Sequence, residues 1–140
     1  MNKEIAAREA LAVADAASLV MLGTNGDDGF PAVKAMLKMA NEGLKKIWFS
    51  TNTSSRRVKA IRKNGKACVY FMDARNWKGL LLTGMAQVLD DQESKKRLWR
   101  EGFEKYYPLG VSDPDYCVVL FTAVRGNYYH ALENADFIVD

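Results

Sequence analysis

The sequence is poor in the residues that most often bind metals or act as nucleophiles. Its 140 residues include two cysteines and a single histidine, His130. Cys68 and Cys117 each lie in an apolar run, where a cysteine usually packs as a small hydrophobic side chain. No Gly-x-Ser-x-Gly, His-Glu-x-x-His or Cys-x-x-Cys pattern occurs. The sequence therefore indicates no metal site and no catalytic triad, and it leaves the catalytic residues unassigned.

Long hydrophobic runs are also absent. The longest, such as residues 117–121, are far shorter than the roughly 20 apolar residues that span a bilayer. The first residues alternate alanine with charge instead of forming the apolar core of a signal peptide. We therefore expect a cytoplasmic protein without a membrane span. Because no repeat or linker divides the chain, we also expect a single domain over residues 1–140.

Short apolar or alternating runs, separated by turn residues, are present instead. They predict strands at residues 18–24, 30–39, 46–50, 67–72, 80–89, 116–124 and 128–131, the first three forming a meander. Three helices are expected. The first spans residues 3–15. The second begins at a cap within residues 53–55 and ends on a left-handed residue at 64–65, and the third begins at a cap at 90 or 91, includes Phe103 and ends before Pro108. This pattern favours a mainly β, α+β fold, a closed or split antiparallel barrel of six or seven strands with flanking helices.

The charge is unevenly distributed along the chain. The net charge is only +3, yet residues 56–66 carry six basic side chains and no acid. Residues 50–55, just before them, read Ser-Thr-Asn-Thr-Ser-Ser. Hydroxyl groups and free backbone N–H groups at the start of a basic helix form an anion site. Two arginines in a first helical turn oppose the helix dipole at a cost of up to about 1 kcal/mol each, unless a bound dianion reverses the local field.

Two other interpretations of this segment stay open. A run of charge is often no more than a solvated surface. Basic residues beside aromatic ones such as Trp48 and Phe49 also occur on barrels that stack single-stranded nucleic acid, although here the aromatic residues alternate as core residues do. The hydroxyl cluster favours phosphate, and we expect no nucleic-acid partner.

Three segments resemble a known family. Residues 50–52, followed by Ser55-Arg56-Arg57, resemble the phosphate-binding stretch of the pyridoxamine 5'-phosphate oxidase-like FMN proteins. Residues 33–38 are similar to the family strand that lies along the isoalloxazine ring, and residues 82–88 resemble its Val-x-Gly-x-Ala-Glu strand. The C-terminal part, with Asp113-Pro114-Asp115 and Tyr128-Tyr129, looks most like the general stress protein branch. The Arg-Leu-x-Pro ending of true pyridoxamine phosphate oxidases is missing, so vitamin B6 oxidation is not expected.

The resemblance implies an FMN-binding split barrel that works as a homodimer, with the flavin in a groove between the subunits. It implies a set of FMN contacts from two parts of the chain: Val33, Lys34, Ala35, Met36, Lys38 and Ser50 beside the ring system, and Thr51, Asn52, Ser55, Arg56 and Arg57 around the phosphate. On the substrate side, it suggests Tyr128 or Tyr129 of the partner subunit. Trp77 is a further candidate, because it lies in an expected loop and either covers the ligand or packs at the dimer seam.

For the function, the resemblance implies an FMN-dependent oxidoreductase that passes electrons from a reduced nicotinamide to a small-molecule acceptor. The alternative is a non-enzymatic module that binds flavin or haem, or that acts as a stress sensor. The sequence contains no committed acid–base pair, which fits both interpretations. Turnover with a reduced nicotinamide distinguishes them.

Overall fold

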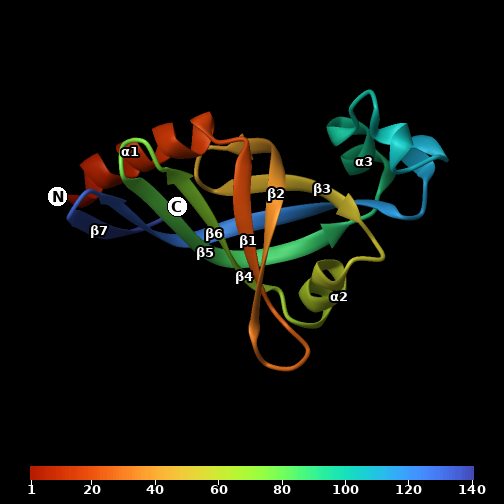
Figure 1. Ribbon diagram of the computed structural model, residues 1–140, viewed down its shortest axis with the longest axis horizontal. Helices are drawn as coiled ribbons and strands as arrows, with labels where there is room; N and C mark the ends of the chain where they lie inside the picture. The colour runs from red at the N-terminus through yellow and green to blue at the C-terminus, as the bar shows by residue number, and fades with distance from the viewer.

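A computed structural model describes all residues, 1–140, as a β-barrel with helices around it (Figure 1). The helices are α1 (Lys3–Ala16), α2 (Arg56–Lys63) and α3 (Gln92–Leu98), with two short 3-10 turns at Phe103–Lys105 and Gly110–Ser112. The strands are β1 (Leu19–Asn25), β2 (Pro31–Glu42), β3 (Lys46–Asn52), β4 (Lys66–Asp73), β5 (Lys78–Leu89), β6 (Tyr116–His130) and β7 (Glu133–Ile138). None of the helices combines the length and the apolarity needed to cross a membrane.

The strands form one antiparallel sheet that closes on itself. Their order is β3-β2-β1-β4-β5-β6-β7, and a further pairing between β3 and β6 joins the two sides. Six strands therefore make a closed barrel, and β7 extends the sheet beyond β6. The first three strands form the meander expected from the turn residues between them. The structure thus confirms the predicted split-barrel, α+β fold.

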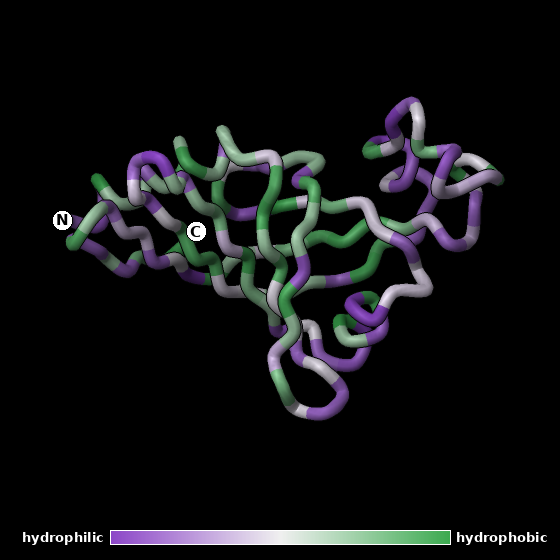
Figure 2. The backbone as a smooth tube through the Cα atoms, in the orientation of Figure 1, coloured by the Kyte–Doolittle hydropathy of each residue, from purple (hydrophilic) through white to green (hydrophobic).

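The barrel core comes from alternate positions on each strand. Side chains such as Leu22, Phe71, Leu82 and Phe121 are fully buried, and their neighbours along the strand point outward. Figure 2 shows the hydrophobic residues concentrated along these strands. The first helix packs against the same core through three buried alanines spaced four residues apart, Ala6, Ala10 and Ala14. Because alanine has almost no side chain, this face lets α1 lie close to the sheet.

The end of the chain differs from the sequence-based prediction. Two strands were expected at 116–124 and 128–131, but β6 is one continuous strand across Gly126, and β7 was not predicted. Gly126 was interpreted as a break, whereas its missing side chain makes room for a neighbour. A Cβ at this position would lie 2.6 Å from Cζ of Phe137, the residue that pairs with it on β7. The glycine therefore allows the last strand to dock.

Two helix endings also differ from the prediction. The third helix ends at Leu98 and does not reach Phe103, because Trp99 is already extended, with a ψ of 136°, and Gly102 then adopts a left-handed φ of 98°. The Trp99 and Phe103 rings, expected on that helix, instead pack edge to face against Tyr116 and each other, beside the short turns. The second helix was expected to end on a left-handed residue, but Asn64 is extended, with a φ of −148°, and leads directly into β4.

Tyr128 is the one buried side chain whose polar atom has no hydrogen-bond partner. Burial raises the pKa of this phenol to about 12, and the Glu9 side chain adds to the shift, although its approach to the hydroxyl falls outside hydrogen-bond geometry in the structure. We expect Tyr128→Phe to leave the free energy of unfolding unchanged or to raise it by about 1 kcal/mol, because an unsatisfied hydroxyl is removed and the ring is kept.

Chemical denaturation followed by circular dichroism measures this effect. The control is Tyr116→Phe, since the Tyr116 hydroxyl donates to the Lys95 carbonyl and also contacts Ser50 Oγ, at 3.1 and 3.2 Å. The free energy of unfolding of Tyr116→Phe is expected to fall by about 1 kcal/mol. A loss of that size in Tyr128→Phe would contradict the interpretation of its hydroxyl as unsatisfied.

Candidate functional site

The first turn of α2 is built from the hydroxyl-rich end of β3. Of the three possible caps, Ser55 is the one that caps the helix, and its Oγ accepts the N–H of Val58 at 3.2 Å. The next two residues, Arg56 and Arg57, occupy the first turn, where backbone N–H groups have no acceptor within the helix. Cationic side chains and free N–H groups are therefore placed together, as the sequence predicts for an anion site.

Arg57 is held in place by the end of β3. Its Nε and Nη2 donate to Oγ1 of the buried Thr51, at 2.9 and 2.6 Å, and Nη2 also donates to Oδ1 of Asn52 at 3.3 Å. One side of the half-buried guanidinium is thus fixed by neutral acceptors, which leaves its charge uncompensated. Thr51 and Asn52 accordingly orient the arginine.

The ion pairs of α2 leave out its first turn. Lys59 and Lys63 pair with Asp27, and Arg62 lies 3.9 Å from Asp90. No acid pairs with Arg56 or Arg57. The uncompensated positive charge of the helix is therefore concentrated at the end where its dipole is also positive, which favours a bound anion.

A loop far along the sequence supports this turn. The Thr53 hydroxyl donates to the carbonyl of Pro114 at 3.0 Å, and the Ser54 N–H donates to Oδ1 of Asp115 at 2.8 Å. The loop is itself fixed by the buried Asp113, whose carboxylate accepts the N–H of Leu109 and of Asp115. The sequence singled out residues 113–115 only by resemblance, and their supporting role was not predicted.

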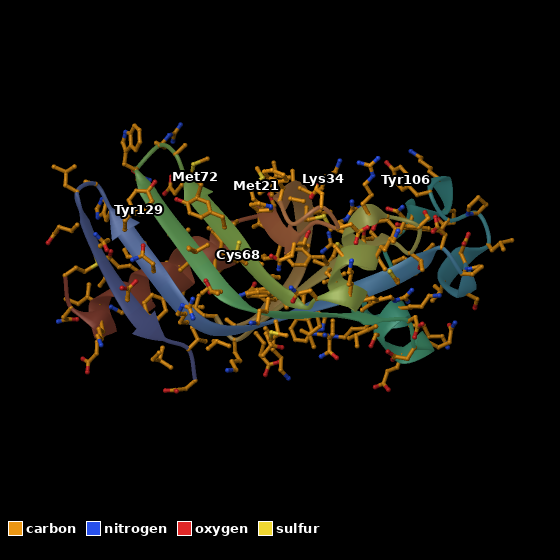
Figure 3. The ribbon with its side chains drawn as sticks, turned by 90° about the horizontal axis from the view of Figure 1, so that it is seen from below. Met21, Lys34, Cys68, Met72, Tyr106 and Tyr129 are labelled. Atoms are coloured by element: carbon orange, nitrogen blue, oxygen red, sulfur yellow. The ribbon has the colours of Figure 1, made fainter.

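An apolar surface lies on the outside of the barrel. Leu19 and Met21 on β1, Val33 and Leu37 on β2, and Met72 on β4 are exposed by 36–68%; we call these five residues the apolar face. They share one side of the sheet, because Leu19 pairs with Leu37 and Met21 pairs with Ala35. Figure 3 shows Met21 and Met72 on the same side. Lys38, the residue after Leu37, pairs with Phe49 on β3, two residues before the Thr51 that Arg57 contacts, so the anion site lies near the Leu37 end of this face.

The candidate ring contacts of β2 fall into three environments. Val33 and Ala35 lie on the exposed side, Met36 is buried in the core, and Lys34 is exposed. Lys38 lies elsewhere, since its Nζ donates to the carbonyls of Ala14 and Asp15, at 2.6 and 3.3 Å, at the carboxyl end of α1. Burial lowers the pKa of Lys38, and Asp15 partly opposes this shift. The Lys38 backbone pairs with Phe49, next to Ser50 on β3, but its side chain is held at the end of α1 and makes no contact with the phosphate-side residues.

The candidate substrate-side residues also differ from one another. Tyr128 is fully buried, so the suggestion that it lines the substrate side is wrong for this residue. Its neighbour Tyr129 points to the other side of β6, the side of the apolar face (Figure 3). Trp77 lies in the turn between β4 and β5, 71% exposed, with a φ of 52°. Tyr70 approaches Tyr129 and was not predicted, although its alternation with Cys68 and Met72 places all three on this side.

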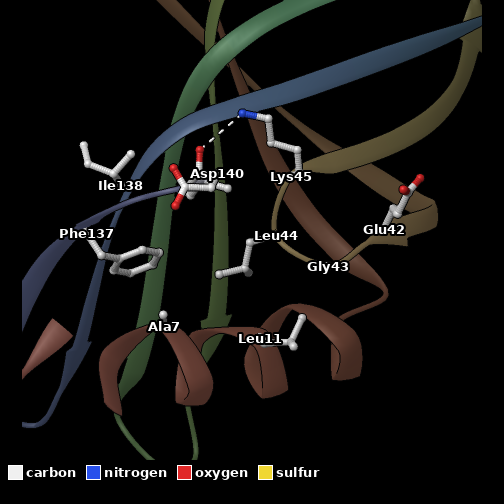
Figure 4. Close-up of a pocket in the computed structure, with 10 residues that line it drawn as sticks. Ala7, Leu11, Glu42, Gly43, Leu44, Lys45, Phe137, Ile138 and Asp140 are labelled. Atoms are coloured by element: carbon white, nitrogen blue, oxygen red, sulfur yellow. Dashed lines mark hydrogen bonds between the residues drawn. The ribbon is translucent and has the colours of Figure 1, made fainter. Parts of the chain in front are cut away.

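Two hollows of the molecule lie away from the arginines. One of about 450 Å³ is lined by α1, the turn between β2 and β3, and the C-terminus (Figure 4). In it, Lys45 Nζ donates to the carbonyl of Val139 at 3.2 Å. A second hollow, of about 550 Å³, lies between the end of α1 and the turn between β4 and β5. The second hollow includes Met72 of the apolar face, whereas neither hollow is lined by Arg56 or Arg57.

Comparisons with known proteins place this geometry in context. The family model described as pyridoxamine 5'-phosphate oxidase like matches residues 6–139. A solved structure from Clostridium acetobutylicum, described as related to general stress protein 26 of Bacillus subtilis and as belonging to the pyridoxinephosphate oxidase family, is 46% identical. Its TM-score is 0.87, and the match covers 99% of this chain and 97% of that one. A comparison with curated protein sequences finds no match.

Two less similar structures share the fold. A heme-binding protein from Mycobacterium smegmatis is 15% identical, with a TM-score of 0.76 and a match over 95% of this chain and 57% of that one. A protein described as an F420 reductase is 18% identical, with a TM-score of 0.64 and a match over 82% of this chain and 93% of that one. Identities this low support a common fold alone.

Proposed function

The chain belongs to the pyridoxamine 5'-phosphate oxidase-like family, and on this premise we propose that it is an FMN-binding flavoprotein that works as a homodimer. The likeness to a relative of general stress protein 26 agrees with the branch that the sequence resembles. The observation that carries the proposal is the pair of first-turn arginines, which have no acidic partner and lie beside an exposed apolar surface.

The two parts of the site match the two parts of FMN. A phosphate dianion fits the N–H groups and guanidinium groups at the start of α2, because arginine binds phosphate through a planar fork of donors. A flat ring system fits the apolar face on β1 and β2, because the short side chains of Val33 and Ala35 project little above the strand. Thr51 and Asn52 hold Arg57 ready for the phosphate, so little ordering of this side chain is required on binding.

The apolar face also supports the homodimer. Leu19, Val33 and Leu37 are 48–68% exposed and adjacent on two paired strands. Contiguous apolar surface of this kind marks an interaction site in most proteins. A second copy of the chain would cover the face and would enclose a ligand that the single chain leaves open to water. Dimerisation then completes the flavin site.

FMN, when bound, would supply the redox chemistry, namely electron transfer from a reduced nicotinamide to a small acceptor. The residues of the chain would bind and orient the cofactor and exclude water from it. This role requires no general acid or base, which agrees with the absence of a close acid–base pair on the face. The protein is then a cytoplasmic oxidoreductase that accepts a small molecule at the exposed side of the ring.

A second candidate is a non-enzymatic module that holds a ligand without turnover. It is favoured by the heme-binding protein that shares this fold. Haem is flat and anionic and would meet the same apolar and cationic surfaces. Titration with haem and with FMN, followed by their absorption bands, distinguishes the two candidates. The flavoprotein is expected to bind FMN more tightly than haem, and the haem-binding module the reverse.

The test of the proposal is the absorption spectrum of the purified protein before and after addition of FMN, followed by anaerobic addition of NADH or NADPH. We expect stoichiometric binding of FMN and bleaching of its visible band by the reduced nicotinamide. Bound flavin that no nicotinamide reduces would favour the module without turnover. A protein that does not bind FMN would overturn the proposal.

A further inference from the structure

The loop before β6 lies directly against the turn that leads into α2. Three hydrogen bonds join the two segments. The Thr53 N–H donates to the Asp115 carbonyl at 2.7 Å, and the Thr53 hydroxyl donates to the Pro114 carbonyl at 3.0 Å. The Ser54 N–H donates to Oδ1 of Asp115 at 2.8 Å. Ser55, the cap of α2, follows at once, so this contact sets the position of the first helical turn.

The Asp115 carboxylate has two opposite effects on an anion bound at that turn. As the acceptor of the Ser54 N–H, it holds the turn in place. As a negative charge beside the first turn of α2, it repels an anion. Asp115 is half buried, and none of the ion pairs of the chain includes it. Its charge is therefore not used to neutralise the arginines, and its two effects can be separated by substitution.

The loop is anchored from behind by two buried charged residues. Asp113 is 7% exposed, and its carboxylate accepts the N–H groups of Leu109 and Asp115, at 3.1 and 2.9 Å. Lys95 on α3 is 4% exposed, and its Nζ donates to the Asp113 carbonyl at 3.0 Å and lies 5.6 Å from the centre of the Tyr116 ring. Because buried polar groups are costly to leave without partners, these contacts hold the loop in one position. Asp115 is therefore presented to the turn by a rigid support.

We propose that Asp115 is a positioning residue of the phosphate site, whose carboxylate oxygen holds the Ser54 N–H and, with it, the first turn of α2 in the geometry that binds a phosphate. Asp115 acts through Ser54 and does not contact the ligand. The role belongs to the oxygen as an acceptor, and the charge of Asp115 opposes it. This role rests on the proposed function, because the phosphate concerned is that of FMN.

The test compares FMN with riboflavin, which has the same ring system and no phosphate, by flavin fluorescence titration of the full chain. Asp115→Ala removes the acceptor and is expected to raise the dissociation constant of FMN about tenfold, the lower value of one charge-assisted hydrogen bond, while that of riboflavin stays unchanged. Asp115→Asn keeps an oxygen that can accept the Ser54 N–H and removes the charge. It is expected to bind FMN as tightly as the wild type or up to about threefold more tightly.

Two further variants separate positioning from stability. Thr53→Val removes only the bond to the Pro114 carbonyl, and it is expected to raise the FMN constant about threefold, the value of a neutral hydrogen bond. It serves as the test if Asp115→Ala does not fold, as judged by circular dichroism. The control is Asp91→Ala, because Asp91 caps α3 and its Oδ2 accepts the Ser94 N–H at 2.9 Å. This variant loses the same type of bond and is expected to lose stability without any change in FMN affinity.

The outcomes distinguish the positioning role from the proposed function. If the wild type binds FMN but Asp115→Ala binds it equally well, or Asp115→Asn is as weak as Asp115→Ala, the positioning role is overturned and the proposed function stands. If the wild type does not bind FMN, the proposed function fails, and titration with inorganic phosphate followed by ³¹P NMR decides the positioning role. Phosphate binding that is weakened in Asp115→Ala and kept in Asp115→Asn supports it, whereas equal binding or no binding overturns it.

Discussion

Replacing Arg56 and Arg57 together by alanine is expected to weaken FMN binding by about a hundredfold or more. Each arginine would lose a charge-assisted hydrogen bond to phosphate, worth roughly 1.5–3 kcal/mol, and 1.4 kcal/mol corresponds to a tenfold change in affinity. No neighbouring side chain can replace them, because the other cations of α2 are paired with Asp27 or lie close to Asp90. Flavin fluorescence titration gives the dissociation constant directly.

A matched variant separates this effect from the loss of net charge. Lys59→Ala and Lys63→Ala together remove the same charge from the same helix, but these lysines are exposed and lie beyond the first turn. Their removal is expected to change the FMN dissociation constant less than threefold, since exposed charges act weakly at a distance. Equal losses in the two double variants would show that the arginines provide only a general positive field.

The single variants should also differ. Arg57 is tied to Thr51 and Asn52, so Arg57→Ala leaves a buried hydroxyl without its donor and is expected to lower stability as well as affinity. Arg56 is exposed and makes no such contact, so its removal should affect affinity alone.

Placing a carboxylate on the apolar face is expected to convert the protein from a dimer into a monomer. Leu37 is 48% exposed and pairs with Leu19, at the end of the face where β1 begins. In a two-fold symmetric dimer, one substitution introduces two charges into the interface, and each unpaired buried charge costs several kcal/mol. Leu37→Asp should therefore sediment as a monomer at micromolar concentration. It should also lose FMN, because the groove between the subunits is lost.

The control for this variant is another exposed leucine. Leu132 lies in the turn between β6 and β7, 99% exposed, and Leu132→Asp is expected to leave the dimer and the flavin unchanged. Both substitutions are at positions exposed in the single chain, so neither should greatly change the free energy of unfolding. A dimeric Leu37→Asp protein that retains FMN would place the interface elsewhere.

Much of the barrel could be predicted from alternation and turn residues alone. The strands near β1 to β5 have one apolar side and clear Gly- or Asn-containing turns, so period-two patterns locate them. The last strand was missed because its outward side carries the polar residues Asn134 and Asp136, and because Gly126 resembles a break. What sets β7 in place is the contact of Phe137 with that glycine, which no local pattern shows.

In the candidate site, too, the sequence predicts local features but not contacts between distant residues. The arginines and the Ser55 cap are local features, and the sequence predicts them well. Their supports come from far along the chain, since Ser54 and Asp115 are 61 positions apart. No strand pattern shows that Tyr70 and Tyr129 both approach Gly79 across β5. The position of Lys38 depends on the end of α1, which strand periodicity cannot locate.

Because β6 is one long strand, the candidate residues at its two ends lie too far apart to contact one ligand within a single copy. Ser50, close to the arginines, pairs with Val118, whereas Tyr129 lies near the other end of β6, so the two positions are separated by roughly 35 Å of strand at about 3.3 Å per residue. One small cofactor does not span that length.

In a dimer, the arginines of one copy and Tyr129 of the other would then form each composite pocket. A hybrid dimer of an Arg56/Arg57-deficient copy and a Tyr129-deficient copy would combine both defects in one pocket and leave the other fully native. Two variants that are impaired alone would therefore complement each other when mixed.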